Sequence, residues 1–384
     1  MFAADVEHVF TVGWLFVGHS CELRAAGDYY TVDIGRDRVI VVRGRDNEIH
    51  AHHDVCAHRG SRIVSAPRGN THSFVCPYHR WVYGLDGRLR AARQMGPCFS
   101  TEQYRLAPVA VREVAGLVFV CLAADPPPFE PFAEALAPQL RPHGLADARI
   151  AARERYRVAA NWKTVVENSR ECYHCGNHPE FLRSNFELGM YGDLRTDAGY
   201  DAVLAAARAR WRAQGLAPED VNFPDGAWYR IARVPLREGY LTETLDGHTV
   251  APVMGTLTGT DTGSLRMVAL PNLLVAHANC DYAMTTAITP VDVGTTDVEV
   301  TFLVHRDAAL ADTNALTAVW RSTSEQDWLL CERAYAGTAS RGYRPGPLSP
   351  LVEGPLMRFH EWYVARLRAG VRGETNDPSS KLLL

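Results

Sequence analysis

The sequence has no hydrophobic run that approaches the ~20 residues of a membrane-spanning helix. Residues 1–16 also lack the basic start that precedes the apolar part of a secretory signal. The 40 basic and 44 acidic side chains nearly balance, and there is no basic block. Charge therefore offers no argument for a nucleic acid or an anionic membrane as a partner. These absences lead us to expect a cytoplasmic protein.

The chain also lacks internal repeats and low-complexity segments. Its 384 residues, of which 47% are hydrophobic, can form one large or two ordinary domains. Nine cysteines are an odd number for a disulfide framework, and four of them fall in short motifs. We therefore expect the thiols to be reduced or metal-bound.

Two stretches of the chain differ in pattern. Residues 30–122 contain short β-branched and aromatic runs separated by Gly, Asn and Asp turns, which predicts an all-β module. The prolines at 126–128 cannot continue a sheet and mark a connector. Beyond them we expect helices over about 129–140, 161–177, 201–214 and 312–336, and strands over 264–271, 282–290 and 298–306.

The predicted fold class is therefore α+β. We expect an N-terminal segment (1–29) that packs on the C-terminal domain, because its aromatic and apolar residues precede the β module. An all-β domain (30–128) and a mixed domain of helices and strands (129–384) follow.

Two loops of the β module each combine one cysteine with one histidine. CAHRG contains Cys56 and His58, and CPYHRW contains Cys76 and His79. Two Cys and two His could bind zinc, or a Rieske [2Fe–2S] cluster in which thiolates hold one iron and imidazoles the other. A zinc finger usually takes one ligand type from each pair, whereas here each loop provides both. The spacing favours the cluster, with zinc as the alternative.

A second group of metal-ligand residue types lies in NWKTVVENSRECYHCGNH, residues 161–178. Glu167, Glu171, His174 and His178 are spaced four, three and four apart, which would place them on one face of the predicted helix. Pro179 biases His178 out of the helical region, so that it would cap the helix. Two His with one carboxylate and open positions are typical of non-haem Fe(II) oxygen chemistry. The alternative is an amphipathic helix with a polar stripe.

Together, CAHRG, CPYHRW and NWKTVVENSRECYHCGNHPEF resemble the catalytic subunit of a Rieske non-haem iron oxygenase, over essentially the whole chain. The resemblance implies that a Rieske domain passes electrons to a mononuclear iron in a helix-grip catalytic domain (an antiparallel sheet with helices), where O₂ is activated. It implies a cluster held by Cys56, His58, Cys76 and His79, and an iron held by His174 and His178. Many relatives have four residues between the two iron histidines, whereas this chain has three.

The third iron ligand comes from a distant segment in this family. Relatives resemble STSEQDWLLCERAYAG at a place where the ligand is an aspartate, which implies Asp327. On the predicted long helix this carboxylate shares a face with Trp320 and Cys331. The alternative is a buried aspartate paired with Arg321 or Arg333.

Glu171 has a separate role by the same resemblance. Family members are homotrimers in which an acidic residue bridges a cluster histidine of one subunit and an iron histidine of the next. A glutamate in this place resembles the subgroup that acts on quaternary ammonium compounds. The alternative for Glu171 is an exposed, solvated side chain. Glu167 lies one turn earlier, and for it the alternative is a salt bridge without a role at the metal.

The substrate expectation also comes from the resemblance. Residues 228–248 and 340–363 resemble the branch of glycine betaine and stachydrine demethylases and their carnitine- and choline-oxidising relatives. A methylammonium group prefers aromatic faces, which Trp228, Tyr229, Tyr282 and Phe186 could provide, although such residues more often pack in a core. The substrate-binding residues stay unknown at this stage.

The implied reaction is a monooxygenation that hydroxylates an N-methyl group, so that formaldehyde and the demethylated amine form. The chain has no G-x-G-x-x-G motif after a strand. Electrons from NAD(P)H should therefore arrive through a flavin and iron–sulfur reductase or a ferredoxin on a separate chain. The open alternatives are hydroxylation of a natural-product or aromatic substrate, a Rieske electron carrier, and a zinc-stabilised binding protein.

Overall fold

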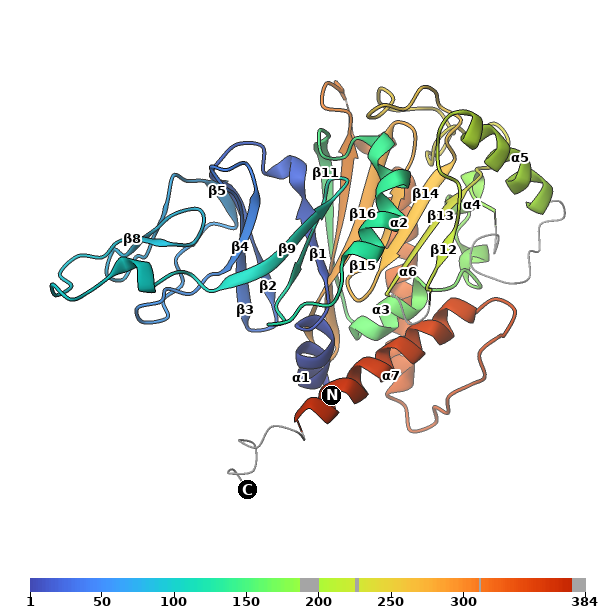
Figure 1. Cartoon of the computed structure of the whole chain (residues 1–384). Helices are drawn as coiled ribbons and strands as arrows, with labels where there is room; N and C mark the ends of the chain where they lie inside the picture. The colour runs from blue at the N-terminus through green and yellow to red at the C-terminus, as the bar shows by residue number, and fades with distance from the viewer. Residues whose placement is uncertain (187–199, 225–227, 311, 375–384) are drawn as a thin grey trace. The chain divides into compact units, whose positions relative to one another are not determined.

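A computed structural model describes residues 1–186, 200–224, 228–310 and 312–374. The chain forms two compact units (Figure 1). The β unit comprises Phe10–Phe129, and the α+β unit comprises Met1–Val9 together with Glu130–Leu384. No helix in the described ranges combines the length and hydropathy that crossing a membrane requires.

The β unit is built from antiparallel strands, as the sequence predicts. Its larger sheet has the order β1-β10-β9-β4-β3-β2-β5. Strand β3 lies inside this sheet, and its run Val39, Ile40, Val41 and Val42 is fully buried, which explains the β-branched composition. The strands are β1 (Leu15–His19), β2 (Asp28–Ile34), β3 (Asp37–Arg43), β4 (Ile49–His53), β5 (Arg68–Asn70), β9 (Pro108–Val114) and β10 (Leu117–Cys121).

A second, three-stranded sheet in this unit has the order β6-β7-β8, with β6 (Phe74–Val75), β7 (Val82–Tyr83) and β8 (Leu89–Ala91). One hydrophobic cluster joins the small sheet to the larger one. It contains Ile40 and Val42 from β3 as well as Phe74, Trp81 and Tyr83. The loops that contain CAHRG and CPYHRW are therefore anchored on a common core.

The α+β unit contains a seven-stranded antiparallel sheet with the order β11-β17-β16-β15-β14-β13-β12. Figure 1 shows helix α2 (Glu130–Leu140) on one face of this sheet and α6 (Asn314–Thr338) on the other. The strands are β11 (Arg149–Val158), β12 (Val221–Asn222), β13 (Tyr229–Val234), β14 (Ser264–Ala269), β15 (Leu273–Ala278), β16 (Tyr282–Asp292) and β17 (Thr295–Val304). The remaining α-helices in the described ranges are α1 (Phe2–Asp5), α3 (Trp162–Asn168), α4 (Phe181–Ser184), α5 (Tyr200–Ala213) and α7 (Gly354–Glu374).

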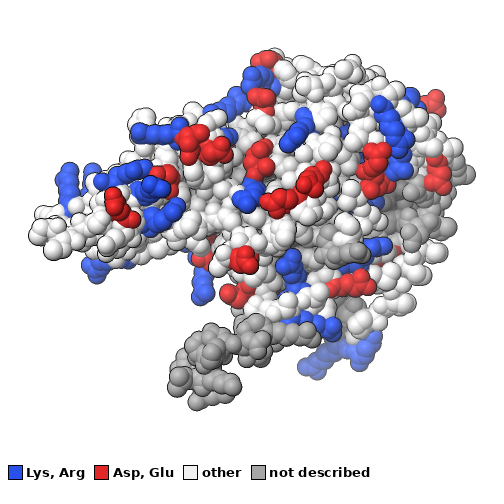
Figure 2. Space-filling view, in the orientation of Figure 1, with Lys and Arg blue, Asp and Glu red and all other residues white. Residues whose placement is uncertain are grey.

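This architecture confirms the predicted all-β domain and the predicted antiparallel sheet with helices. The sequence predicts the strands at 264–271, 282–290 and 298–306 and the helices at 129–140, 201–214 and 312–336 to within a few residues. On the face that Figure 2 shows, Lys and Arg side chains lie among Asp and Glu side chains, as the balanced composition leads one to expect.

The N-terminal segment is divided between the two units, which differs from the expectation that residues 1–29 pack together on the C-terminal domain. Met1–Val9 belongs to the α+β unit, where Asp5 is buried and accepts hydrogen bonds from Trp162, Lys163 and Tyr363. Strand β1 instead pairs with β10, which makes it part of the β unit.

The helix expected over 161–177 is shorter than the sequence indicates. Asn161 caps α3 by accepting a hydrogen bond from the backbone N–H of Lys163, but the helix ends at Asn168. A turn and a short 3₁₀ segment, η5 (Cys175–Asn177), follow. The predicted stripe of Glu167, Glu171, His174 and His178 on one helical face is therefore wrong, because these residues do not share a helix.

A buried polar network lies among strands β14 and β15. Glu243 is fully buried and accepts hydrogen bonds from Arg266 at 3.0 Å, from Ser264 at 3.0 Å and from Asn279 at 3.1 Å. The Nδ1 atom of His277 lies 2.9 Å from the same carboxylate. Burial alone would raise the pKa of Glu243, but His277 and Arg266 outweigh burial and lower the pKa to about 2. The sheet thus contains an ionised carboxylate with four donors.

Candidate metal centres

The two Cys/His loops of the β unit have matching backbone geometry. The N–H of Gly60 donates to the carbonyl of Cys56, and the N–H of Arg80 donates to the carbonyl of Cys76. Both closing residues have a positive φ, 72° for Gly60 and 60° for Arg80. Each loop therefore turns back four residues after its cysteine and presents its histidine beside the other loop.

The cysteine and histidine side chains of the two loops differ in burial. The thiols of Cys56 and Cys76 are 2% and 1% exposed, whereas His58 is exposed and His79 is half-buried. The two imidazole rings lie with their centroids 4.6 Å apart. This arrangement fits a cluster that has one iron held by thiolates inside the domain and another held by imidazoles near its surface.

The same geometry argues against zinc. Among the described residues, the only group of three or more Cys, His, Asp or Glu donors that could hold a single ion is His174, His178 and Asp327. The Cys56, His58, Cys76 and His79 donors thus do not converge on one ion, which a tetrahedral zinc site requires.

Two aromatic residues that the sequence analysis did not single out support these loops. The hydroxyl of Tyr83 lies 3.1 Å from the Cys56 sulfur and accepts a hydrogen bond from the backbone N–H of Ala57. The indole of Trp81 stacks on His58 at a centroid distance of 4.8 Å. Both residues act through tertiary contacts, and only their place after the CPYHR run could have indicated them.

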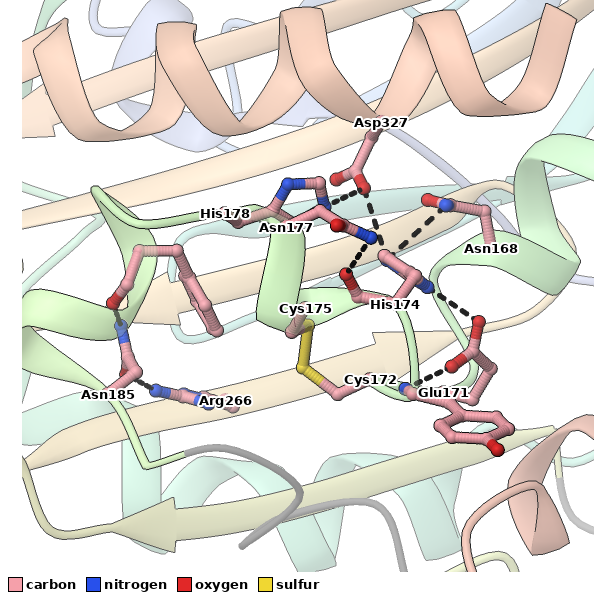
Figure 3. The surroundings of a disulfide bond; sticks show 12 residues. Asn168, Glu171, Cys172, His174, Cys175, Asn177, His178, Asn185, Arg266 and Asp327 are labelled. Atoms are coloured by element: carbon pink, nitrogen blue, oxygen red, sulfur yellow. Dashed lines mark hydrogen bonds and ion pairs between the residues drawn. A yellow bond between two sulfur atoms is a disulfide. The ribbon is translucent and has the colours of Figure 1, made fainter. Parts of the chain in front are cut away.

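The α+β unit holds a second constellation, on the turn after α3 and on α6 (Figure 3). His174 precedes η5, and His178 ends it with φ −116° and ψ 73°, outside the helical region as Pro179 predicts. The Oδ1 atom of Asp327 lies 3.2 Å from Nε2 of His174 and 2.9 Å from Nε2 of His178. One donor atom from each residue lies within 4.8 Å of the others.

This set fits a divalent transition metal. The His178 side chain is 1% exposed, whereas the side chains of His174 and Asp327 are each 18% exposed, so the donors face accessible space on one side. Three protein ligands with an open side are the arrangement that non-haem Fe(II) oxygen chemistry needs. The alternative pairing of Asp327 with Arg321 is not formed, because Arg321 pairs with Glu154 at 2.7 Å.

Glu171 holds the outer nitrogen of His174. Its Oε1 atom lies 2.6 Å from Nδ1 of His174, and its other oxygen accepts a hydrogen bond from the backbone N–H of Tyr173. A proton on Nδ1 leaves the lone pair of Nε2 directed at Asp327, which is the tautomer that a metal ligand requires. Glu171 is thus engaged with His174 and is not the exposed, solvated side chain of the alternative interpretation.

The electrostatics of this constellation favour a bound cation. Burial alone would lower the pKa of His174, but the carboxylates of Asp327 and Glu171 outweigh burial and raise the pKa to about 9. Burial would raise the pKa of Asp327, yet hydrogen bonds from His174 and His178 keep it below its usual value. Without a metal, these groups therefore hold a proton in the place where a cation would be bound.

A disulfide joins Cys172 and Cys175 in the turn that contains His174 (Figure 3). The expectation of reduced or metal-bound thiols is therefore wrong for this pair. The turn after α3 brings their Cα atoms to 4.9 Å, within the range for a disulfide. The other seven cysteines form no disulfide.

The remaining candidates from the sequence have other partners. Glu167 accepts from Nε2 of His360 at 2.9 Å, in agreement with a salt-bridge role. Trp228 and Tyr229 pack on Phe132 of α2, and Phe186 packs on Tyr200. Of the four proposed cage residues, only Tyr282 joins a hydrophobic cluster with Cys172 and Cys175.

Comparisons with known families cover both units. A family described as "Rieske [2Fe-2S] domain" matches residues 13–110, and one described as "Ring hydroxylating alpha subunit (catalytic domain)" matches residues 145–369. The second match covers more than half of the chain, which excludes an isolated Rieske electron carrier.

Curated relatives match over nearly the full length. The chain is 36% identical to the glycine betaine monooxygenase oxygenase subunit of Pseudomonas aeruginosa, over 96% of this chain and 86% of that one. It is 40% identical to the protein of the same name from Chromohalobacter salexigens, over 94% of this chain and 82% of that one. The match to the carnitine monooxygenase oxygenase subunit of Escherichia coli is 38% identical, and it covers 48% of this chain and 50% of that one.

Solved structures share the fold. The quaternary ammonium Rieske monooxygenase CntA in complex with L-carnitine superposes with a TM-score of 0.67 at 22% identity, and the match covers 95% of this chain and 92% of that one. Its two-domain architecture corresponds to the β unit and the α+β unit described above. The family carries a Rieske [2Fe–2S] cluster and a mononuclear iron, and as an oxygenase subunit it depends on electrons from a separate reductase. With two metal-binding constellations, matching family domains and full-length relatives, the chain belongs to the alpha subunits of the Rieske non-haem iron oxygenases and is a monooxygenase of that family.

Proposed function

We propose that this protein hydroxylates, and thereby N-demethylates, a small quaternary ammonium or N-methyl compound of the glycine betaine and stachydrine class. The observation that carries the proposal is the 36–40% identity over nearly the whole chain to proteins named glycine betaine monooxygenase oxygenase subunits. The shorter matches are to carnitine monooxygenase oxygenase subunits, and carnitine is also a quaternary ammonium compound.

The two constellations then have separate roles. Cys56, His58, Cys76 and His79 would hold the Rieske cluster, because their thiols are buried and their imidazoles lie near the surface. His174, His178 and Asp327 would hold the mononuclear iron, which activates O₂ when it is bound. The short spacing between the two histidines is compatible with this role, because both Nε2 atoms face one carboxylate oxygen.

Glu171 would relay between the centres of neighbouring subunits in a homotrimer. Its bond to Nδ1 of His174 supplies one half of such a bridge. As an ionised acceptor, it has capacity for a second imidazole N–H from a cluster ligand. A flavin and iron–sulfur reductase or a ferredoxin would deliver the electrons from NAD(P)H, in the cytoplasm.

The reaction balances with one O₂, two electrons and two protons. One oxygen atom enters a C–H bond of an N-methyl group, and the other leaves as water. The resulting carbinolamine then loses formaldehyde and a proton, which yields the demethylated amine.

Aromatic side chains pack in the same hydrophobic cluster as Cys172 and Cys175, on the turn that contains His174. Tyr282 and Trp320 are buried in one cluster with Phe181, which lies three residues after His178. The Tyr282 hydroxyl donates to the carbonyl of Glu243 and accepts from the Trp320 indole, so both rings are fixed.

Turnover assays with a compatible reductase, NADH and O₂ test the proposal. We expect formaldehyde release from glycine betaine, stachydrine or carnitine, in a fixed ratio to the O₂ consumed, and none from the Asp327→Ala variant. Choline is tested as a quaternary ammonium compound that lacks a carboxylate. A partial match to the salicylate 5-hydroxylase large oxygenase component of a Ralstonia species, 32% identical over 58% of this chain, makes salicylate the comparison substrate. Hydroxylation of salicylate without formaldehyde from any methylammonium compound would refute the proposal.

A further inference from the structure

The Cys172–Cys175 disulfide encloses a residue of the candidate iron site. Between the two cysteines lie Tyr173 and His174, and Glu171 directly precedes them. Figure 3 shows the sulfur–sulfur bond on the same turn as the His174 ring. A cross-link at this point therefore limits the conformations of the segment that presents His174 to Asp327.

Backbone hydrogen bonds hold the same turn, but only weakly. The N–H of Cys175 donates to the Cys172 carbonyl at 3.1 Å, and the N–H of Asn177 donates to the His174 carbonyl at 3.0 Å. Neither belongs to a helix of more than one turn, since α3 ends at Asn168 and η5 has three residues. Without the disulfide, the position of His174 would depend on hydrogen bonds alone, among them the bond between its Nδ1 atom and Glu171.

The disulfide lies just beneath the surface of the α+β unit. Cys172 and Cys175 are 3% and 6% exposed and pack in a hydrophobic cluster, but Tyr173 between them is 66% exposed. Gly176, next to Cys175, is also exposed. A small reductant can therefore reach the sulfur atoms after a local opening of the turn.

The chemistry of the pair indicates a reversible role. The other seven cysteines form no disulfide, so the chain shows no general tendency to form such bonds. In reducing compartments, a disulfide between cysteines a few residues apart is typically a redox-sensing or catalytic one. A structural staple is a weak explanation here, because a link across three residues closes a very short loop and constrains little of the unfolded chain.

We propose that Cys172 and Cys175 form a reversible redox-modification site, closed by a peroxide and opened by a thiol reductant, whose closed form holds His174 in its metal-binding position. The claim about His174 rests on the proposed function, in which His174 is an iron ligand. The modification itself does not depend on that assignment.

Each direction of the modification balances. In closure, one thiol attacks a hydrogen peroxide oxygen and becomes a sulfenic acid with release of water. The second thiol then attacks the sulfenic sulfur, which forms the disulfide and releases a second water. In opening, two reductant thiols take the place of the bonded sulfurs in successive exchange steps, and the reductant leaves as its own disulfide.

Alkylation of the holoenzyme tests the modification directly. Trypsin cleavage after Arg170 and Arg183 releases residues 171–183, which contain both cysteines and no other. After treatment with reduced glutathione and iodoacetamide, we expect this peptide to carry two alkyl groups. A second sample is reduced in the same way, freed of glutathione, treated with hydrogen peroxide and only then exposed to iodoacetamide. In that sample we expect an unalkylated peptide that is two hydrogens lighter than the reduced peptide. A peptide that glutathione never opens, or that peroxide never closes again, would overturn the proposal.

Iron release tests the link to His174. With a chelator present, the opened enzyme should lose its non-cluster iron about 10-fold faster than the closed enzyme, the lower end of the effect of groups that position metal ligands. The Cys172→Ser/Cys175→Ser variant should match the opened wild type whatever its treatment. Cys98→Ser removes an exposed thiol in the β unit and should leave both rates as in the wild type.

The two failures are distinguishable. Equal iron release from the opened and closed forms would overturn the inference while leaving the proposed function intact. If neither form bound any non-cluster iron, the ligand assignment would fail, and the inference about His174 would fail with it. The alkylation pattern, which does not involve iron, separates these cases even if the double variant does not fold.

Discussion

Asp327 brings one carboxylate oxygen within 3.2 Å of two histidine Nε2 atoms that come from a separate part of the chain. Its role can be tested at the level of this one side chain. Asp327→Ala should reduce the affinity for the mononuclear iron by more than about 100-fold, the upper limit for residues that only support ligands. The visible absorption of the cluster should not change.

Iron analysis and absorption spectra of the same preparation provide the measurement. Glu325→Ala is the matched control, because Glu325 is an exposed acid on the same helix, two residues away. It should keep both metals. Full iron occupancy and turnover in Asp327→Ala would show that Asp327 is not a ligand.

We expect Tyr83 to tune the proposed cluster, because its hydroxyl lies 3.1 Å from the Cys56 sulfur. A hydrogen bond donated to a ligand sulfur stabilises the reduced cluster and raises its potential. Tyr83→Phe should therefore lower the potential by about 60 mV, the one-electron equivalent of a hydrogen bond of about 1.5 kcal/mol. A redox titration followed by visible circular dichroism measures the shift.

The control for Tyr83 is Tyr104→Phe. Tyr104 stacks on Phe99 at 5.0 Å and contacts Trp81, so its ring contributes to the same hydrophobic cluster. Its substitution should leave the potential of the cluster unchanged. A Tyr83→Phe variant with the potential of the wild type would exclude the hydroxyl as a tuning group.

At the residue scale, ligand types could be predicted and supporting residues could not. Cys56, His58, His174 and His178 belong to residue types that few others replace at a metal, and local spacing brings them together. The partners of the Tyr83 hydroxyl lie 26 and 27 positions away in the sequence, and those of the Glu243 carboxylate lie 21 or more positions away. No local pattern indicates such partners.

Among the secondary-structure elements, the turn after α3 shows why a spacing can mislead. Glu167, Glu171, His174 and His178 have the spacing of residues on one helical face. The same spacing also occurs where a short helix is followed by a compact turn. Here Ser169 ends α3 and donates its hydroxyl to the carbonyl of Val166, while Glu171 satisfies the N–H of Tyr173. Side-chain hydrogen bonds that compete with the helix therefore decided the local structure.

The polar network among strands β14 and β15 has a consequence for stability against acid. The pKa of Glu243 in the folded protein is about 2, below its ordinary value of 4.5. A lowered pKa means that the ionised carboxylate stabilises the folded state above pH ~4.5 and that this stabilisation is lost as the pH falls toward 2. We expect a loss on the order of 1–3 kcal/mol over this range.

Thermal unfolding of the wild type and Glu243→Gln between about pH 5 and pH 3 measures this effect. The wild type should lose stability more steeply, whereas the variant should start lower and change less. Glu238→Gln, at an exposed acid five positions away in the sequence, should keep the slope of the wild type. Parallel slopes for the wild type and Glu243→Gln would argue against a folded-state carboxylate with a lowered pKa.

For the whole molecule, the proposed assembly makes Glu171 the residue on which electron delivery depends. Glu171→Gln keeps the size and one acceptor oxygen but removes the charge that binds His174 Nδ1. We expect both metal sites to stay occupied and the single-turnover reoxidation of the cluster to slow by roughly 10- to 100-fold.

Stopped-flow absorption of the reduced cluster, with substrate and O₂, measures that rate. Glu167→Gln is the control, because Glu167 precedes Glu171 by four residues and pairs with His360. Its reoxidation rate should equal that of the wild type. The same rate in Glu171→Gln would remove this residue from the electron path.

The two-unit organisation was predictable from the change in pattern near the prolines at 126–128, since strand-rich and mixed segments meet there. The division of the N-terminal segment was not predictable. Phe10, Trp14 and Phe16 are all buried, and apolar character alone does not show which hydrophobic core a side chain joins.

The placement of Asp5 has a consequence for the order of events during translation. The carboxylate of Asp5 lies among Trp162, Lys163 and the Tyr363 hydroxyl, and Tyr363 is 358 positions further along the chain. At the usual 5–20 residues per second, the ribosome needs about 20–70 s to make the last of these partners after the first residues emerge. During that interval Asp5 lacks its Tyr363 partner, while all residues of the β unit between them are synthesised.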